Sequence, residues 1–152
     1  MLPHWLPQLP PLLQPWVSRP LPLHPCLCDV WHDHVLFTGD RVAGIIDYGA
    51  MKVDHAAVDL ARMLGSLAGD DETAWQAGFA AYCSVCTFSK EDERLAHVLD
   101  VSGTVLGVAN WLMRIAVENR PALEQAAVAR RLETLVARME GWETKMPLAA
   151  ER

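Results

Sequence analysis

The sequence predicts an α+β fold that is mainly helical, with one short β-hairpin followed by about four helices. Two observations lead to this prediction. Two short apolar runs, 35–38 and 42–46, flank the turn formers Gly39 and Asp40, a pattern typical of paired antiparallel strands. From Asp54 onwards, apolar residues recur at three- and four-residue spacing, which is the period of an amphipathic helix.

The first two helices follow the hairpin directly. One is expected to begin near Asp54 and to end near Gly65 or Gly69. The next follows the sequence "GDDE", where Asp70 or Asp71 can serve as the N-cap. Its expected apolar side is formed by Trp75, Phe79, Tyr82 and Cys86.

The third and fourth helices complete the predicted fold. Ser89 to Asp92 has the capping-box pattern, with Asp where Glu or Gln is more usual, and the third helix is expected to extend to about Glu118. Pro121 suits the first turn of a last helix that ends at Gly141. The side chains of the third helix expected to point inward are Leu95, Val98, Leu99, Leu106, Leu112 and Met113.

Residues 1–25 form a proline-rich lead-in. They hold eight of the ten prolines, so we expect an extended segment with a short helix over 12–17. The segment is apolar, but it lacks the basic start of a secretory signal. We therefore expect a cytoplasmic protein whose four cysteines are not disulfide-bonded.

Composition excludes some classes of partner. The formal net charge is −6 and no Lys/Arg run is present, which argues against binding to a nucleic-acid backbone and is compatible with a cationic small molecule. The longest uncharged stretch of the C-terminal half, 101–113, is shorter than the roughly 20 residues that a membrane-spanning helix needs. The sequence therefore predicts no membrane segment.

The cysteines permit two kinds of chemistry. A small zinc-binding protein would use Cys26, Cys28, Cys83 and Cys86, since C-x-x-C is a common zinc half-site. Against this, Cys83 and Cys86 fall within a predicted amphipathic helix, which favours buried core thiols. Cys28 also lies close in sequence to two histidines, and a Cys–His pair can produce a nucleophilic thiolate.

The carboxylates suggest another kind of site. Asp29 precedes the hairpin and Asp47 follows it, 18 residues later. Because a hairpin returns the chain to its starting point, both carboxylates are expected at the same edge of the small sheet, beside His32-Asp33-His34. Such a group suits a divalent cation, or one metal-binding carboxylate and one base. The alternative is that both are solvated turn residues or helix caps.

The segment "CDVWHDHVLFTGDRVAGIIDYG" resembles the catalytic segment of the aminoglycoside phosphotransferase and choline kinase-like family, relatives of protein kinases that phosphorylate small molecules. That family's usual form is His-Gly-Asp, four variable residues, Asn, two strands, and then Ile-Asp-aromatic-Gly. Asp29 takes the place of the catalytic Asp, and Asp47 that of the metal-binding Asp. Asp59-Leu60-Ala61 is similar to the Asp-Leu-Ala of the family's next helix.

The resemblance implies a kinase-like C-terminal lobe and a role for each aspartate. Asp29 would accept the proton of a substrate hydroxyl or orient that hydroxyl. Asp47 would bind Mg²⁺ bridging the phosphates of ATP, whose transfer depends on positioning and charge neutralisation. Asp59 would support the backbone of the catalytic loop. The implied reaction is ATP-dependent phosphorylation of a small-molecule hydroxyl, on an aminoglycoside-, choline- or homoserine-like compound.

The sequence departs from the family pattern at several positions. The family's His-Gly is Leu27-Cys28 here, and its metal-binding Asn is His34, a softer ligand than Mg²⁺ prefers. His34 is kept as a candidate metal ligand that replaces the Asn. Trp31, His32 and Asp33 are the candidates for the substrate side of the loop.

The family places an N-terminal ATP-binding lobe before this segment. Only 28 residues precede Asp29 here and none is Lys, so the sequence predicts the C-terminal lobe alone, over residues 26–145. The missing lobe could be supplied by a partner, and the face that it covers should be apolar and prone to self-association. The alternative is a non-catalytic remnant or interaction module of the same fold. Asp100, Glu118 and Glu140 are either substrate-pocket residues or part of a solvated helix face.

Overall fold

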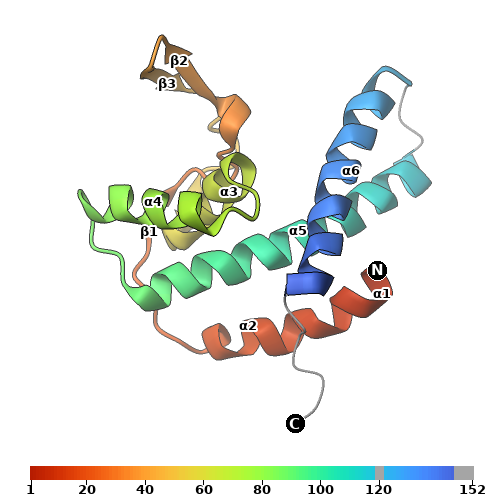
Figure 1. The fold of residues 1–152 in the computed structure, drawn as a ribbon, viewed down its shortest axis with the longest axis horizontal. Coiled ribbons are helices and arrows are strands. Elements are labelled where there is room, and N and C mark those ends of the chain that lie inside the picture. The colour runs from red at the N-terminus through yellow and green to blue at the C-terminus, as the bar shows by residue number, and fades with distance from the viewer. Residues whose placement is uncertain (119–121, 146–152) are drawn as a thin grey trace. The chain divides into compact units, whose positions relative to one another are not determined.

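The structure is a computed structural model, which describes the fold of residues 1–118 and 122–145 (Figure 1). The mainly helical α+β class predicted from the sequence is confirmed. In chain order the elements are α1 (Leu2–Trp5), η1 (Leu6–Gln8), α2 (Leu9–Val17), β1 (His24–Cys26), η2 (His32–His34), β2 (Val35–Thr38), β3 (Arg41–Ile45), β4 (Lys52–Asp54), α3 (Ala57–Leu67), α4 (Glu72–Cys83), α5 (Lys90–Glu118) and α6 (Ala122–Lys145).

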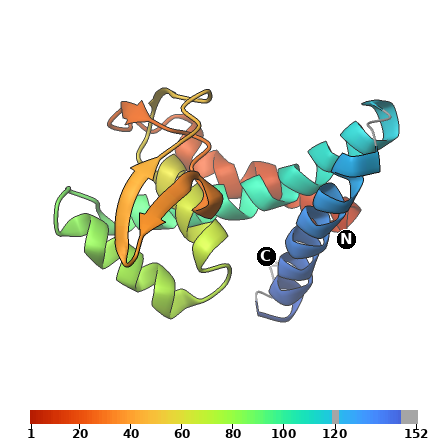
Figure 2. The same cartoon turned by 90° about the horizontal axis from the view of Figure 1, so that it is seen from above.

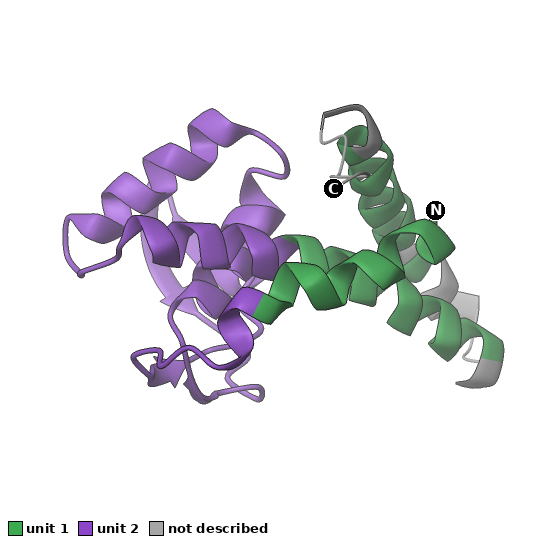
Figure 3. Cartoon of the chain, turned by 90° about the horizontal axis from the view of Figure 1, so that it is seen from below, with its two compact units in different colours: residues 1–14, 101–152 green, residues 15–100 purple. Residues whose placement is uncertain are grey.

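The chain is divided into two compact units (Figure 3). One comprises residues 15–100 and includes all the residues of the catalytic segment. The other comprises residues 1–14 and 101–152, and α5 contributes residues to both. The core of the 15–100 unit is formed by Ala57, Ala61, Leu64, Trp75, Phe79, Phe88, Leu95 and Ala96. The core of the other unit is formed by Trp5, Leu9, Val105, Val108, Leu135, Met139 and Trp142.

The proline-rich N-terminus is helical, and the prediction that it is mostly extended was wrong. Helical turns α1, η1 and α2 together cover residues 2–17. Proline is tolerated in the first turn of a helix, where its missing N–H needs no partner, and both α1 and η1 carry Pro at their first positions. Trp5 and Leu9 are buried in the core of their unit, which favours the helical conformation over an extended one.

The predicted hairpin is confirmed as β2 and β3 (Figure 2). The two strands pair antiparallel, with Val35 opposite Ile45 and Phe37 opposite Val42. Gly39 in the turn has φ of +57°, a left-handed conformation that glycine adopts without steric cost. Figure 1 shows the hairpin standing away from α3 and α4, and Phe37 and Val42 are each 60% exposed.

A second antiparallel ladder joins β1 to β4, and the sequence did not predict it. It pairs only three residues from each strand, His24–Cys26 with Lys52–Asp54. Strands of three residues are too short to show an alternation of apolar and polar residues, and these two strands are far apart in the sequence. Because residues 52–54 are used by β4, α3 begins at Ala57 rather than at Asp54.

Helix α4 has the N-cap that the sequence suggested. One oxygen of Asp71 accepts hydrogen bonds from the backbone N–H groups of Thr73 (2.9 Å) and Ala74 (3.1 Å). Of the two predicted candidates, Asp71 rather than Asp70 is therefore the cap. The helix ends at Cys83, so Cys86 lies beyond it.

The predicted capping box at the start of α5 is confirmed. The Asp92 carboxylate accepts hydrogen bonds from the backbone N–H of Ser89 (2.8 Å) and from its hydroxyl (2.7 Å). The Asp92 N–H in turn donates to the Ser89 hydroxyl (3.2 Å). Nε2 of the buried His55 lies 3.3 Å from the other oxygen of this carboxylate, Oδ1. Burial opposes ionisation of Asp92, but the bonds from Ser89 and the nearby His55 lower its pKa overall.

This lowered pKa makes stability depend on pH in acid. We expect Asp92→Asn to lower the free energy of unfolding by about 1 kcal/mol at neutral pH, the usual cost of a lost cap. Since the folded-state pKa lies below the unfolded one, near 3.9, the stabilisation is full above that value and is lost as pH falls through the folded pKa. Urea denaturation between about pH 7 and pH 2 should show the two proteins converging in acid. A constant difference across that range would contradict the assignment.

The long helix α5 differs from the prediction in its second half. Leu95 is buried as expected, but Val105 and Val108 fill the core of the second unit. Three side chains predicted to point inward are exposed, namely Leu106, Leu112 and Met113. The prediction assumed one apolar face for the whole helix, whereas α5 serves two cores and uses a different set of residues for each.

Helix α6 extends to Lys145 and does not stop at Gly141, so that boundary was wrong. Trp142, beyond the glycine, is buried and its ring lies 5.6 Å from that of Trp5, a contact that favours continuing the helix. Pro121, its predicted first residue, lies outside the described residues.

One described helix segment, Lys90–Ala116 of α5, is long and apolar enough to cross a membrane by length and composition alone. The uncharged stretch 101–113 is only part of this segment, so the expectation of no such helix was based on too short a span. About one third of its most apolar window is buried inside the protein. A core helix of a soluble protein passes the same test, so the finding is weak support for a membrane segment.

Candidate active site

The loop between β1 and η2 presents Asp29, the predicted catalytic residue, and its backbone is held by Asp59. The two oxygens of the Asp59 carboxylate accept hydrogen bonds from the backbone N–H groups of Leu27 (2.9 Å) and Cys28 (2.7 Å). Asp59 lies in the first turn of α3, so this helix holds the backbone of the two residues that precede Asp29. Cys28 has φ of +63°, which turns the chain sharply just before Asp29.

His34 connects this loop to the end of the hairpin. Its Nδ1 lies 2.8 Å from the carbonyl oxygen of Asp29, and its Nε2 lies 2.7 Å from the indole nitrogen of Trp31. A carbonyl only accepts and an indole N–H only donates, so the ring must carry its proton on Nδ1 and accept at Nε2. Both ring nitrogens of this neutral tautomer are therefore occupied.

Asp47 follows strand β3 and lies near His34, which precedes strand β2. The backbone N–H of Ile46 donates to the carbonyl oxygen of His34 (2.9 Å), which extends the pairing of the strands to this point. One oxygen of Asp47 lies 3.9 Å from Nε2 of His34. Asp47 is mostly exposed and has φ of +64°, a left-handed conformation that Asp and Asn tolerate better than most residues. His34 therefore contacts the backbone of Asp29 with one ring nitrogen and lies near the carboxylate of Asp47 with the other. The convergence of the two carboxylates stays a prediction.

These residues fit a magnesium ion only in part. The Asp47 carboxylate is exposed, and Mg²⁺ is commonly bound through one or two carboxylates together with substrate phosphates. His34 does not fit as the second ligand, because the Trp31 indole occupies the nitrogen that would face the ion. Among the described residues no three His, Cys, Asp or Glu side chains are grouped closely enough to hold a metal by themselves.

A sequence model of the family described as "Phosphotransferase enzyme family" matches residues 2–98, which is more than half of the chain. The chain belongs to this phosphotransferase family. Searches of curated proteins and of solved structures gave no match. The matched range contains the loop, the hairpin and helices α3 and α4, and it supports the resemblance drawn from the catalytic segment.

The geometry bears on one departure of this chain from the family pattern that its catalytic segment resembles. Cys28 stands where the family has Gly, and its φ of +63° is a conformation that glycine adopts freely and cysteine does not. Burial raises the pKa of the Cys28 thiol, and the nearby Asp59 carboxylate raises it further. A thiol with a raised pKa is not an activated nucleophile, so the structure does not support the nucleophilic-cysteine interpretation.

We therefore expect Cys28→Gly to be tolerated and to stabilise the protein by up to about 1 kcal/mol, because relief of the left-handed strain outweighs the extra chain entropy of glycine. Cys28→Val is the matched comparison, since a β-branched residue adopts this conformation least readily, and it should destabilise. Thermal unfolding of the three proteins measures both effects. Destabilisation by both substitutions would show that the thiol, rather than the backbone, matters here.

Two residues of α3 that contact the loop between β1 and η2 were not predicted from the sequence. Arg62 forms an ion pair with Asp29 through Nη2 and Oδ1. The hydroxyl of Ser66 accepts a hydrogen bond from the backbone N–H of His32 (3.0 Å). Both follow Asp59 at helical spacing, and that spacing is the only signal in the sequence that would have indicated them.

The three substrate-side candidates differ in their surroundings. Trp31 is half-buried, and its ring lies 5.1 Å from that of His32 and 5.4 Å from that of His34. His32 and Asp33 are both exposed, and Nε2 of His32 lies 3.2 Å from Oδ1 of Asp33. Trp31 therefore contributes to the arrangement of the loop, whereas the other two face solvent.

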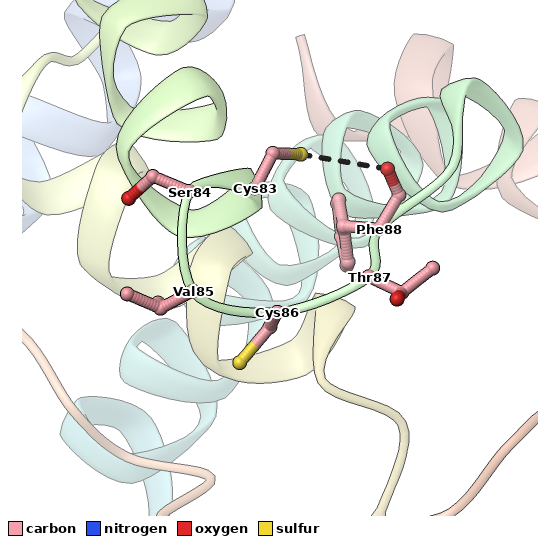
Figure 4. Close-up of a pocket in the computed structure, with 6 residues that line it drawn as sticks. All are labelled: Cys83, Ser84, Val85, Cys86, Thr87 and Phe88. Atoms are coloured by element: carbon pink, nitrogen blue, oxygen red, sulfur yellow. Dashed lines mark hydrogen bonds between the residues drawn. The ribbon is translucent and has the colours of Figure 1, made fainter.

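The cysteine predictions need correction. Cys83 and Cys86 are both exposed, so the expectation that they are core thiols was wrong; α4 ends before it can bury Cys86. They line a surface depression formed by residues 83–88 (Figure 4). The Cys83 sulfur donates to the carbonyl oxygen of Phe88 (3.5 Å), while the Cys86 side chain points elsewhere (Figure 4). The structure gives no support to a zinc site that includes these two residues.

The later helices carry the three acidic residues that the sequence offered as candidates for a substrate pocket. Asp100 is half-buried in α5 and Glu140 is exposed in α6. The side chain of Glu118 lies outside the described residues.

Proposed function

We propose that this protein is the C-terminal catalytic lobe of an ATP-dependent phosphotransferase that acts on a hydroxyl group of a small molecule in the cytoplasm. The observation that carries the proposal is that His34 contacts the backbone carbonyl of Asp29 and lies 3.9 Å from the Asp47 carboxylate, beside a loop whose backbone is held by Asp59. The family membership supports the phosphotransferase class.

In the proposed reaction, the hydroxyl oxygen of the substrate forms a bond to the γ-phosphorus of ATP. The bond from that phosphorus to the bridging oxygen breaks, and ADP leaves with the electron pair. Asp29 orients the hydroxyl and accepts its proton. Asp47 is the residue that would hold Mg²⁺, which supplies charge neutralisation at the phosphates when it is bound. His34 links the two loops through its hydrogen bonds rather than through a metal.

Calorimetric titration of Mg-ATP into the chain tests the role of Asp47. We expect Asp47→Asn to weaken binding at least tenfold, because it removes the charge that attracts the cation. Asn is preferred to Ala here because it tolerates the left-handed backbone. Asp40→Asn, at an exposed carboxylate in the hairpin turn, is the matched control and should change nothing. Strong binding that Asp47→Asn leaves unaffected would show that the assigned role is wrong.

Phosphoryl transfer from radiolabelled ATP to a panel of hydroxyl compounds tests the role of Asp29. We expect Asp29→Asn to lower turnover on a positive compound by a factor of about 10² to 10⁴, the usual contribution of a general base. Its affinity for ATP should stay unchanged, because Asp29 does not bind the nucleotide in this proposal. Equal turnover by wild type and Asp29→Asn would contradict the proposal.

The second candidate function is a non-catalytic interaction module of the same fold. One contact favours it: the Trp31 indole occupies Nε2 of His34, the nitrogen that would otherwise be available to a metal ion. A chain that binds no Mg-ATP and transfers no phosphate would support this alternative.

An apolar surface on the hairpin is a candidate contact for a partner. Phe37 and Val42 are opposite each other in the β2–β3 ladder, so their exposed side chains lie on one face. We expect the protein to self-associate as concentration rises, because exposed apolar patches of this kind favour association. Sedimentation velocity should show this, and Phe37→Ser with Val42→Thr should weaken it. Val85→Thr, at an apolar side chain exposed elsewhere, is the control. A strictly monomeric wild type would contradict the expectation.

A further inference from the structure

Helix α3 carries three polar residues on one face, Asp59, Arg62 and Ser66, at spacings of three and four residues. Residues at this spacing share a face of a helix. Each of the three contacts a different part of the loop formed by residues 27–32. We refer to these three residues as the loop-facing stripe.

The members of the stripe hold different groups of the loop. Asp59 accepts from two backbone N–H groups before Asp29, and Ser66 accepts from one after it. Arg62, between them on the helix, is the member that contacts a side chain of the loop, and that side chain is Asp29. The loop backbone is therefore fixed on both sides of Asp29, and the carboxylate itself is fixed by Arg62.

We propose that Arg62 is the positioning residue for Asp29 in the phosphotransferase reaction, an inference that rests on the proposed function. Nη2 of Arg62 binds Oδ1 of Asp29, and the described residues offer Oδ2 no hydrogen-bond donor. Oδ2 is then the oxygen that accepts the proton of the substrate hydroxyl, while Oδ1 stays on the guanidinium. Arg suits this role because its rigid, planar group fixes the plane of a carboxylate, whereas the Lys ammonium is a flexible point charge.

The exposure of the pair separates positioning from stability. The side chains of Arg62 and Asp29 are 39% and 46% exposed. Ion pairs as exposed as this one contribute little to folding. Substitution of Arg62 should therefore leave the protein folded while it frees the Asp29 carboxylate to rotate.

The test compares Arg62→Met, which removes the charge and the planar group, with Arg62→Lys, which keeps the charge. Arg94→Met is the matched control, since Arg94 forms a similar exposed pair with Glu91 on α5 and touches no part of the loop. The first measurement needs no substrate: NMR of selectively labelled protein reports the side-chain carboxyl carbon of Asp29 and the backbone amides of residues 29–34. The second is kcat and KM on a compound found positive in the transfer assay.

We expect Arg62→Met to shift the Asp29 carboxyl resonance, to lower kcat at least tenfold and to leave KM for ATP unchanged. Arg62→Lys should recover part of the kcat, and Arg94→Met should match wild type. An Asp29 resonance and a kcat unchanged in Arg62→Met would overturn the proposal, as would a kcat that rises. If the wild type transfers no phosphate, the proposed function fails on its own, and the Asp29 resonance still decides whether Arg62 holds this carboxylate. A folded Arg62→Met with an unmoved resonance then overturns the inference.

Discussion

Replacement of Phe79 with alanine is expected to lower the free energy of unfolding of the 15–100 unit by about 3–5 kcal/mol. Phe79 is 1% exposed and lies at the centre of an aromatic group in the core of that unit. Its ring centroid lies 5.6 Å from Trp75, 5.9 Å from Phe88 and 5.5 Å from His97. Removal of the ring loses the apolar transfer energy and leaves a cavity that these rigid neighbours cannot fill.

Urea denaturation followed by circular dichroism measures this loss, and Phe37→Ala is the matched control. Phe37 is 60% exposed on the hairpin, so the same chemical change there should cost less than about 0.5 kcal/mol. A loss of about 3–5 kcal/mol at Phe79 would be a large part of the free energy of unfolding of a typical domain, which is about 5–15 kcal/mol. Equal effects of the two substitutions would contradict the assignment of Phe79 to the core.

Replacement of Asp59 with alanine is expected to cost about 2–4 kcal/mol, because two backbone N–H groups lose their acceptor at once. Leu27 and Cys28 donate to its two oxygens at 2.9 and 2.7 Å, and both residues are partly buried. A carboxylate that accepts two such bonds provides charge-assisted hydrogen bonding that a neutral group does not match. The loop before Asp29 should also lose its fixed conformation, which amide hydrogen exchange of residues 27–32 would report.

Asp59→Asn serves as the matched variant for this prediction. The amide has the same shape but only one accepting oxygen, so we expect it to retain one of the two bonds and to cost roughly half as much. Asp33→Ala, at an exposed carboxylate of the same loop, should change stability by less than about 0.5 kcal/mol. Asp59→Ala with wild-type stability and wild-type loop exchange would show that the two bonds are not important in solution.

The parts of the fold that were predicted correctly depend on local chemistry. The turn at Gly39, the N-cap at Asp71 and the capping box at Ser89 are each decided by residues close together in the sequence. The β1–β4 ladder was missed because its two strands are short and distant in sequence. The helical N-terminus was missed because burial of Trp5 overrides the bias that proline gives to the local backbone.

The candidate site shows the same division. The sequence of the hairpin predicts that the carboxylates of Asp29 and Asp47 lie at one edge. In the structure His34 contacts the backbone carbonyl of Asp29 and lies near the carboxylate of Asp47, so the convergence of the two carboxylates stays a prediction. The state of His34 was not predictable, because it depends on the tautomer that Trp31 and a backbone carbonyl select together. Arg62 was not singled out either, since a charge on a helix faces water unless a loop folds over it.

The loop-facing stripe of α3 has a thermodynamic consequence for the search for a substrate. The opposite face of α3, with Ala57, Ala61 and Leu64, packs into the core of the 15–100 unit. The same short helix therefore joins the loop that would meet a ligand to the apolar interior. A compound that binds only the ordered loop stabilises the folded unit, by about 2.7 kcal/mol at a concentration one hundred times its Kd. A melting-temperature screen of hydroxyl compounds would detect such a ligand before any turnover is measured.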